Sequence, residues 1–332
     1  MVIVDGSSAP GRPFTVCRDG DPVPATLARA VVAVGNFDGV HRGHQHLIAV
    51  AEAQARENGG PAAVMTFEPH PQAFFRPDVP HFRLTPDPVK LAVLGRLGLD
   101  GVFVRRFDAA LAAMSAADFV QGLMAGELGV AGVVAGHDFH FGRGREGTPQ
   151  VLQELCAGAG LSCTIVSVVE EQGAPVSSSA IRTALAQGNI AGANELLGYR
   201  WFVAGEVRHG EKRGRTLGFP TANIALDPAC GLRHGIYAVR AALGAGDVRD
   251  GVASFGRRPT FDDGAPLLET YLFDFAGDLY GRTVEVEFVS FIRPEERFES
   301  ADALVARMNE DAREARQLLA VAQGRGPRSL IA

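Results

Sequence analysis

The chain has 332 residues, 46% of them hydrophobic and 21% charged, which is the composition of an ordinary globular protein. A chain of this length favours two domains over a single core. The net charge of −6 argues against general nucleic-acid binding, which needs a broad basic face. No stretch reaches the ~18 apolar residues of a membrane span, and the first residues do not resemble a signal peptide. The four cysteines form no C-x-x-C pair, which favours reduced thiols. We therefore expect a cytoplasmic protein with no nucleic-acid and no membrane partner.

Short β-branched runs alternate with amphipathic stretches up to about Leu185. The runs that predict strands are Ala30–Val34, Ala62–Phe67, Gly101–Val104, Gly132–Ala135 and Thr164–Val168. The stretches that predict helices are Leu47–Arg56, Pro88–Leu97, Ala116–Glu127 and Pro149–Ala159. This alternation predicts an α/β domain with a parallel sheet and helices on both faces. Ligands of such sheets bind beyond the carboxyl ends of the strands.

The pattern changes at Gln187-Gly188-Asn189, so we expect one domain over residues 1–187 and a second over residues 188–325. The strands expected in the second domain are Trp201–Arg208, Ile236–Ala242, Val248–Phe255, Leu268–Phe273 and Val284–Phe291. Closely spaced strands separated by Gly and Asp turns predict an antiparallel barrel or sandwich. Glu299–Ala322 is expected to form one long closing helix. The chain after Gln323 is expected to fray.

The segment Gly35–His44, with the sequence GNFDGVHRGH, follows a β-branched run, where a buried parallel strand should pass into a helix. Gly35 and Gly43 let the backbone approach a ligand, and His41 and His44 share one face of the first helical turn. A helix start suits a phosphate, to which imidazoles can add cationic hydrogen bonds. The pattern therefore predicts an adenylyl-transfer site. A plain capping turn is the alternative, and a zinc site is disfavoured because the segment has no H-E-x-x-H spacing.

Two further segments carry polar groups that suit the same edge of the sheet. The loop Gly136–Gly147 combines glycines, two arginines and aromatic residues, and it is either an exposed loop or a site where Asp138 orients a nucleotide or flavin. The serines of Val176–Arg182 precede a helix, where serine is usually an N-cap. With Arg182 one turn inside the helix, the same hydroxyls can instead hold a triphosphate.

The segment Gly205–Ile224 interleaves glycines with Lys and Arg, which makes a cationic loop that can fold over phosphates. It lacks the spacing of an ordinary P-loop. Thr221 and Asn223 alternate, so on a strand both side-chain oxygens point to one face, where they can hold Mg²⁺. The alternative is a basic hairpin turn followed by an ordinary strand.

Glu269 lies among apolar neighbours in a strand-like segment, Leu267–Phe275. A partly buried carboxylate in such a place suits a general base. Most strand glutamates are simply solvated, so the residues alone favour a surface role for this side chain.

Four segments of the first domain, in this order, resemble the FMN adenylyltransferase module of the bacterial bifunctional riboflavin kinase/FAD synthetase family. These segments are Gly35–His44, Thr66–Pro71, Gly136–Gly142 and Ser178–Arg182. The resemblance implies a Rossmann-like nucleotidyltransferase fold with His41, His44 and Arg182 in catalysis. The residues that it implies at ATP are Gly35, Phe37, Asp38, Gly43, Ser178 and Ser179. The residues that it implies at the flavin or nucleotide are Asp138, Phe67, Pro69 and Phe141.

The second domain resembles the riboflavin kinase module of the same family. The segments that carry the resemblance are Gly218–Asn223, Gly235–Val239, Arg258–Thr260 and Glu269–Phe275. The resemblance implies a kinase-like barrel in which Glu269 is the base for the riboflavin 5′-hydroxyl. The residues implied at the kinase ATP are Gly210, Lys212, Arg215 and Gly218, and those implied at Mg²⁺ are Thr221 and Asn223. Four residues depart from frequent family residues: Ser179, Ser254, Phe255 and Tyr271.

The resemblance covers roughly Arg29 to Arg316 and implies a bifunctional enzyme. Riboflavin would be phosphorylated by ATP to FMN in the second domain, and FMN would be adenylylated to FAD and pyrophosphate in the first. Mg²⁺ would accompany ATP, and flavins would be substrate and product. Two alternatives remain: a non-catalytic flavin sensor, and an adenylyltransferase for another phosphorylated metabolite. The oligomeric state is left open, a weak homo-oligomer included.

Overall fold

A computed structural model of the chain describes residues 13–171, 173–210, 218–244, 246–257 and 266–331. The chain forms two compact units: Met1–His81 with Thr85–Ser177, and Phe82–Leu84 with Ser178–Ala332. The helix Ser178–Gln187 therefore belongs to the second unit by its contacts. The limits 1–187 and 188–325 stay a prediction about where the two functions reside.

The first unit is built on a six-stranded sheet in the order β1-β4-β3-β2-β5-β6, and every pairing in it is parallel. Its strands are β1 (Thr15–Arg18), β2 (Val31–Val34), β3 (Ala62–Glu68), β4 (Gly101–Arg106), β5 (Gly132–Gly136) and β6 (Ser162–Val166). The predicted parallel sheet is confirmed. The edge strand β1 was not predicted, and β6 begins and ends two residues earlier than the predicted Thr164–Val168.

Helices connect these strands, as the alternation predicts for a parallel sheet. They are α1 (Arg42–Glu57), α2 (Pro71–Phe75), α3 (Asp87–Arg96), α4 (Ala109–Ala113) and α5 (Pro149–Gly158). The stretch predicted as a helix over Ala116–Glu127 instead forms a π-helix over Asp118–Glu127. A two-stranded ribbon, β7 (Glu170–Glu171) and β8 (Ala174–Pro175), follows the last strand of the sheet.

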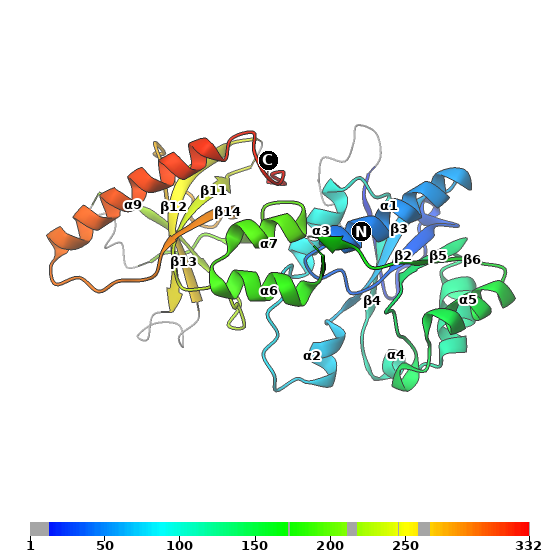
Figure 1. Cartoon of the computed structure of the whole chain (residues 1–332). Helices are drawn as coiled ribbons and strands as arrows, with labels where there is room; N and C mark the ends of the chain where they lie inside the picture. Colours follow the sequence, from blue (N-terminus) through cyan, green and yellow to red (C-terminus); the bar gives the residue numbers. More distant parts are fainter. Residues whose placement is uncertain (1–12, 172, 211–217, 245, 258–265, 332) are drawn as a thin grey trace. The chain divides into compact units, whose positions relative to one another are not determined.

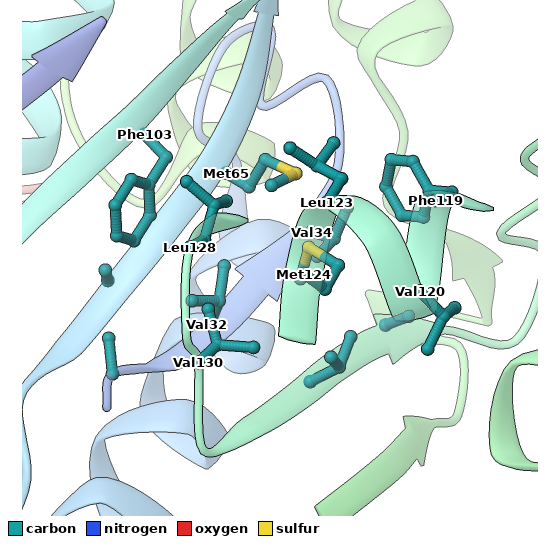
Figure 2. Close-up of a cluster of buried hydrophobic side chains, with 14 of the residues drawn as sticks. Val32, Val34, Met65, Phe103, Phe119, Val120, Leu123, Met124, Leu128 and Val130 are labelled. Carbon is teal, nitrogen blue, oxygen red and sulfur yellow. The ribbon is translucent and has the colours of Figure 1, made fainter. Parts of the chain in front are cut away.

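One face of the sheet is covered by the π-helix and α5. Figure 2 shows Leu123 and Met124 of the π-helix among Val34 and Met65 of the central strands. Because side chains alternate along a strand, the neighbouring residues face the other side, where α3 reaches Thr66. The central strands β2 and β3 are therefore buried on both faces, which is the setting of a continuous β-branched run.

The second unit is an antiparallel sheet in the order β10-β13-β12-β11-β14-β9. Its strands are β9 (Phe202–Glu206), β10 (Thr221–Ala225), β11 (Gly235–Ala242), β12 (Val248–Arg257), β13 (Pro266–Leu272) and β14 (Thr283–Arg293). The two edge strands meet through a bridge between Arg208 and Asn223, which closes the sheet into a barrel. Of the two predicted architectures, the barrel is the one observed.

Among its described residues, the second unit also has the helices α6 (Ser178–Gln187), α7 (Ile190–Leu197) and α9 (Ala301–Val321). Figure 1 shows α9 lying along β11 and β12, and its buried Ala315 and Leu319 pack against Ala238 and Val252 of those strands. The predicted closing helix is thus confirmed. Within the described residues, no helix is long and apolar enough to cross a membrane.

The expectation that the chain frays after Gln323 is wrong. Leu330 is 8% exposed and Ile331 is 3% exposed, and Arg328 bridges to Tyr199 through the backbone. Arg200 donates to the carbonyls of Ala322 and Arg325 and pairs with Glu287, which also accepts from Ser329. Long-range ion pairing and apolar burial hold this tail, and neither is visible in the local sequence.

A buried ion pair attaches α9 to the barrel. Arg293 at the end of β14 donates to both carboxylate oxygens of Asp311, at 2.8 and 2.6 Å, and both side chains are less than a tenth exposed. Removing one partner leaves the other charged and buried, so we predict that Arg293→Met lowers the unfolding free energy by about 3–5 kcal/mol. Chemical denaturation of the full chain measures this loss.

The matched control is an exposed ion pair between Arg316 on the same helix and Asp274, which follows β13. Both of its side chains lie mostly in solvent, and Asp274 has φ of 54°, which asparagine also tolerates, so Asp274→Asn should leave the denaturation midpoint unchanged. Equal effects of the two substitutions would contradict the assignment of Arg293 as the anchor of α9.

Candidate active sites

The turn between β2 and α1 has a backbone that its residues disfavour. Phe37 has φ of 50° and Val40 has φ of 38°, in the left-handed region that a β-branched residue such as valine rarely adopts. Both side chains are fully buried, so packing holds the turn in this conformation. The turn delivers His41 directly to the start of α1.

His41 and His44 form a stacked pair at the first turn of α1, as their spacing predicts. Their ring centroids are 3.7 Å apart, and His41 Nδ1 accepts a hydrogen bond from the backbone N–H of His44 at 3.3 Å. Gly43 lies between them, and a Cβ there would come within 3.1 Å of the His41 ring. The motif thus places two imidazoles and a helix N-terminus together, which is an arrangement suited to phosphate.

The surroundings of His44 favour the neutral form of its imidazole, and cationic hydrogen bonds from this residue to a bound phosphate stay a prediction. Burial lowers the pKa of His44 well below its ordinary value, and the charges of His41 and Lys90 lower it further. Its Nδ1 is shielded from solvent and has no hydrogen-bond partner in the structure. A neutral imidazole can still donate one N–H to a phosphate oxygen.

The side chains of Phe37 and Asp38, both expected at ATP, are turned into the protein. Phe37 is fully buried and contacts the His44 ring with centroids 4.9 Å apart. Asp38 is 3% exposed, and its Oδ1 accepts a hydrogen bond from the backbone N–H of Thr85 at 3.0 Å. Thr85 Oγ1 in turn accepts from the backbone N–H of Gly39 at 2.8 Å. In this conformation the two side chains shape the turn, and a contact of these residues with ATP stays a prediction.

Sequence reasoning missed Lys90 on α3, which lies beneath the same turn. Lys90 is 1% exposed, and its Nζ pairs with Glu68 Oε1 at 2.8 Å. The ammonium also donates to Thr66 Oγ1 at 3.0 Å and approaches the carbonyl oxygen of Asn36 at 3.4 Å. Thr66 Oγ1 donates to that same carbonyl at 2.9 Å. A charged group therefore connects the ends of β2 and β3.

The residues expected at the flavin lie at or after the ends of β3 and β5, the two strands that flank β2, and their exposure is unequal. Phe67 is 7% exposed and meets Phe107 edge to face, with ring centroids 6.0 Å apart. Phe141 is also 7% exposed and packs on Phe119 in the core. Asp138, after β5, is exposed. Pro69 directly follows the end of β3.

Ser178, Ser179 and Arg182 lie at the start of α6, which belongs to the second compact unit. Arg182 Nε donates to the backbone carbonyl of Phe82 at 2.6 Å, also within that unit. That these residues reach the ATP phosphates remains a prediction.

The barrel brings the kinase candidates together across two adjacent strands. Asn223 on β10 is the register partner of Glu269 on β13, and Thr221 is the partner of Tyr271. Directly opposed residues share a face, with Cβ atoms roughly 5 Å apart. Thr221, Asn223 and Glu269 therefore point to one side of the sheet. The sequence analysis predicted this shared face on the condition that Thr221 and Asn223 lie on a strand. They do lie on one, the strand β10.

Asn223 carries the group that best fits a bound cation. The side chain is 6% exposed, its Nδ2 donates to the Thr221 carbonyl at 3.3 Å, and its Oδ1 is buried without a hydrogen-bond partner. A buried amide oxygen without a partner costs free energy that a metal ion or ligand donor recovers. The residues present therefore fit a magnesium ion held by oxygen ligands.

Gly210 packs directly on this amide. A Cβ at Gly210 would lie 2.6 Å from Asn223 Nδ2, so only glycine leaves room for the asparagine side chain. Gly218 has φ of 85°, a conformation that also favours glycine. Lys212 and Arg215, predicted at the kinase ATP, and Arg258–Thr260 lie outside the described residues.

Two candidate phosphate sites on two fold types indicate the class of this chain. It is a two-domain enzyme of nucleotide chemistry, with an α/β nucleotidyltransferase-like unit followed by a kinase-like barrel. The FAD synthetase family model matches residues 23–180, and the riboflavin kinase family model matches residues 197–319. The chain belongs to the bifunctional riboflavin kinase/FMN adenylyltransferase family.

Curated relatives with that name span nearly the whole chain. The protein of Escherichia coli (strain K12) is 42% identical over 288 residues, which cover 86% of this chain and 92% of the relative. The protein of Bacillus subtilis (strain 168) is 39% identical over 293 residues, covering 87% and 92% respectively. The protein of Pseudomonas fluorescens is 41% identical over 291 residues, covering 87% and 93%.

A solved structure from Streptococcus pneumoniae, described as a macrolide-efflux protein, superposes with a TM-score of 0.78. It is 33% identical, and the match covers 87% of this chain and 94% of that one. Its description differs from the family names above. The family models and the curated relatives agree with each other and cover both units, so they decide the family of this chain.

We predict that His44→Ala lowers FAD formation from FMN by about 10²-fold, because one preorganised donor to the ATP phosphates is lost. FMN formation from riboflavin by the same protein should be unchanged. The matched control is His46→Ala, since His46 is exposed on the same helix. Equal loss of both activities in the His44 variant would contradict separate sites.

The lowered pKa of His44 also predicts a pH dependence of stability. The unfolded chain protonates this residue near its ordinary pKa of 6.5, whereas the folded protein keeps it neutral to lower pH. The unfolded state then binds more protons in this range, so stability falls as pH drops below about 6.5. Melting temperatures from about pH 8 to about pH 5 should fall more steeply for the wild type than for His44→Gln. Parallel profiles would contradict the buried neutral imidazole.

We predict that Gly210→Ala lowers FMN formation by at least about tenfold, because the added methyl group displaces the Asn223 amide. FAD formation from supplied FMN is the internal control and should stay at the wild-type rate. An unchanged rate of FMN formation would show that the position of this amide does not matter for the kinase reaction.

Proposed function

We propose that this chain makes FAD from riboflavin in two ATP-dependent steps, each on its own unit. The barrel phosphorylates riboflavin to FMN, and the α/β unit adenylylates FMN to FAD with release of pyrophosphate. The observation that carries this proposal is the pairing of Asn223 with Glu269 in the barrel, in a chain that also keeps the stacked histidines of the α/β unit. A single chain thus holds one set of residues for each reaction.

In the adenylylation step, a phosphate oxygen of FMN attacks the α-phosphorus of ATP and pyrophosphate leaves. FMN brings its own nucleophile, so the protein needs no nucleophilic side chain. The start of α1 orients the ATP phosphates, and His41 and His44 donate hydrogen bonds to them. Ser178, Ser179 and Arg182 of α6 are proposed to bind the same phosphates, which would neutralise charge on the leaving pyrophosphate.

In the kinase step, the riboflavin 5′-hydroxyl attacks the γ-phosphorus of ATP, the bond from this phosphorus to the bridging oxygen breaks, and ADP leaves. Glu269 is proposed to accept the proton of that hydroxyl, and its oxygens lie on the same face of the barrel as Thr221 and Asn223. The residues Gly210 and Gly218 let the backbone approach the nucleotide, and Lys212 and Arg215 are proposed to contact its phosphates. Catalysis rests mainly on alignment and charge neutralisation.

We propose Mg²⁺ as the cation that accompanies ATP, held in the barrel by Thr221 and Asn223. The unpartnered Oδ1 of Asn223 supports this assignment. When bound, the ion would neutralise charge that develops on the phosphate oxygens. The chain supplies two oxygen ligands close to the proposed base Glu269. Asn223 is the register partner of Glu269, and Thr221 lies two residues before Asn223 on β10.

The products formed distinguish the proposed function from the two alternatives, the flavin sensor and the adenylyltransferase for another metabolite. Pure protein is incubated with riboflavin, ATP and Mg²⁺, and the flavins are separated by chromatography over time. We expect FMN to appear first and FAD to follow. Bound flavin without product would indicate the sensor. FMN without FAD, together with adenylylation of another phosphorylated metabolite such as phosphopantetheine, would indicate the other adenylyltransferase.

Glu269→Gln tests the base directly. The amide keeps the size of the side chain but cannot accept the proton, so FMN formation should fall by about 10²–10⁴-fold. FAD formation from FMN should be unchanged. Glu314→Gln, at an exposed position on α9, is the matched control. Near wild-type FMN formation by the Glu269 variant would contradict its assignment as the base.

A further inference from the structure

Lysine is almost absent from this chain. The sequence contains thirty arginines and two lysines, Lys90 and Lys212. Arginine therefore serves nearly every basic position, and a site that keeps lysine requires an ammonium rather than a guanidinium. Lys90 is 1% exposed, whereas lysine is almost never buried unless it is paired.

The surroundings of Lys90 explain this requirement. Its ammonium has three N–H groups, and three oxygens from β3 and from the turn after β2 surround it: Glu68 Oε1 at 2.8 Å, Thr66 Oγ1 at 3.0 Å and Asn36 O at 3.4 Å. A compact point charge can meet three converging acceptors, while the planar fork of arginine needs more room. The site is therefore built for one ammonium group.

The contact with Asn36 matters because of where that residue lies. Asn36 directly precedes Phe37, the first of the three positive-φ residues in the turn that leads to His41. The helix that carries Lys90 follows Thr85, which binds Asp38 and Gly39 in the same turn. The segment from Thr85 to Lys90 therefore holds this disfavoured turn at two points.

We propose that Lys90 is a positioning residue of the adenylyl-transfer site, fixing the turn from Asn36 to Val40 on the ends of β2 and β3. It does not touch substrate in this arrangement, since its side chain is buried. Its ammonium keeps the backbone before His41 in the shape that presents the first turn of α1 to the ATP phosphates. This inference rests on the proposed adenylyl-transfer site and adds a residue to it.

The test must separate positioning from the cost of a stranded charge. Lys90→Met alone leaves the Glu68 carboxylate without its partner and can destabilise the first unit. The double variant Lys90→Met with Glu68→Gln removes both charges and so removes that cost. It does not restore the ammonium contacts to Thr66 and Asn36.

The experiment measures kcat and KM for FAD formation, the melting temperature, and FMN formation from riboflavin in each full-length variant. For the double variant we expect a melting temperature near wild type, but a kcat/KM for ATP at least about tenfold lower. The KM for FMN and the rate of FMN formation should remain within about twofold of wild type. Arg18→Met removes a half-exposed pair with Asp87 on the same helix, and it should leave FAD formation unchanged.

A double variant with wild-type kinetics for ATP would overturn the proposal, because Lys90 would then serve only to balance Glu68. If the double variant and Arg18→Met lose FAD formation to the same extent, the proposal is overturned as well, because the loss would then not depend on Lys90. A wild-type protein that forms no FAD would instead contradict the proposed function, so the two failures are distinguishable.

Discussion

The turn between β2 and α1 is where the first unit departs most from what its own residues prefer. A buried phenylalanine and a buried valine adopt left-handed backbone conformations there. Such a turn persists only where its surroundings determine it. Here the hydrogen bonds of Asp38 and Gly39 with Thr85, and the ammonium of Lys90, provide that support. The placement of both histidines depends on it.

In the barrel, the register of the paired strands places the candidate site residues. Asn223 and Glu269 face each other because β10 and β13 pair antiparallel, and the bridge between Arg208 and Asn223 closes the sheet beside them. A shift of one residue would turn both side chains to the opposite face. That face carries Ile224 and Leu268, both fully buried, so the packing of the barrel interior fixes the register of the site.

The central strands and the closing helix could be predicted from the sequence because their signals are local. The β-branched run at Val31–Val34 and the spacing of His41 and His44 indicate a strand end and a helical face directly. Lys90 could not be predicted in this way, because its partner Asn36 lies 54 residues away in the chain. Its isolation among arginines was the one available signal.

Other differences have equally physical causes. The strand β1 has only four residues, too few for an alternating pattern to stand out. The chain after Gln323 is polar and glycine-containing, which locally resembles a free end. Its order comes from Arg200 and Glu287, which are distant in sequence. The neutral state of His44 follows from burial, and spacing alone does not report burial.

The central claim is that the two reactions occur at two independent sites, so that FMN made at one site is a substrate for the other. It is tested most directly by mixing two full-length variants, each of which is expected to lack one of the two activities: His44→Ala and Glu269→Gln. With riboflavin, ATP and Mg²⁺, the first alone should stop at FMN and the second alone should leave riboflavin unchanged. The account predicts that the mixture makes FAD. A mixture that still makes no FAD, although each variant keeps its own remaining activity, would contradict it.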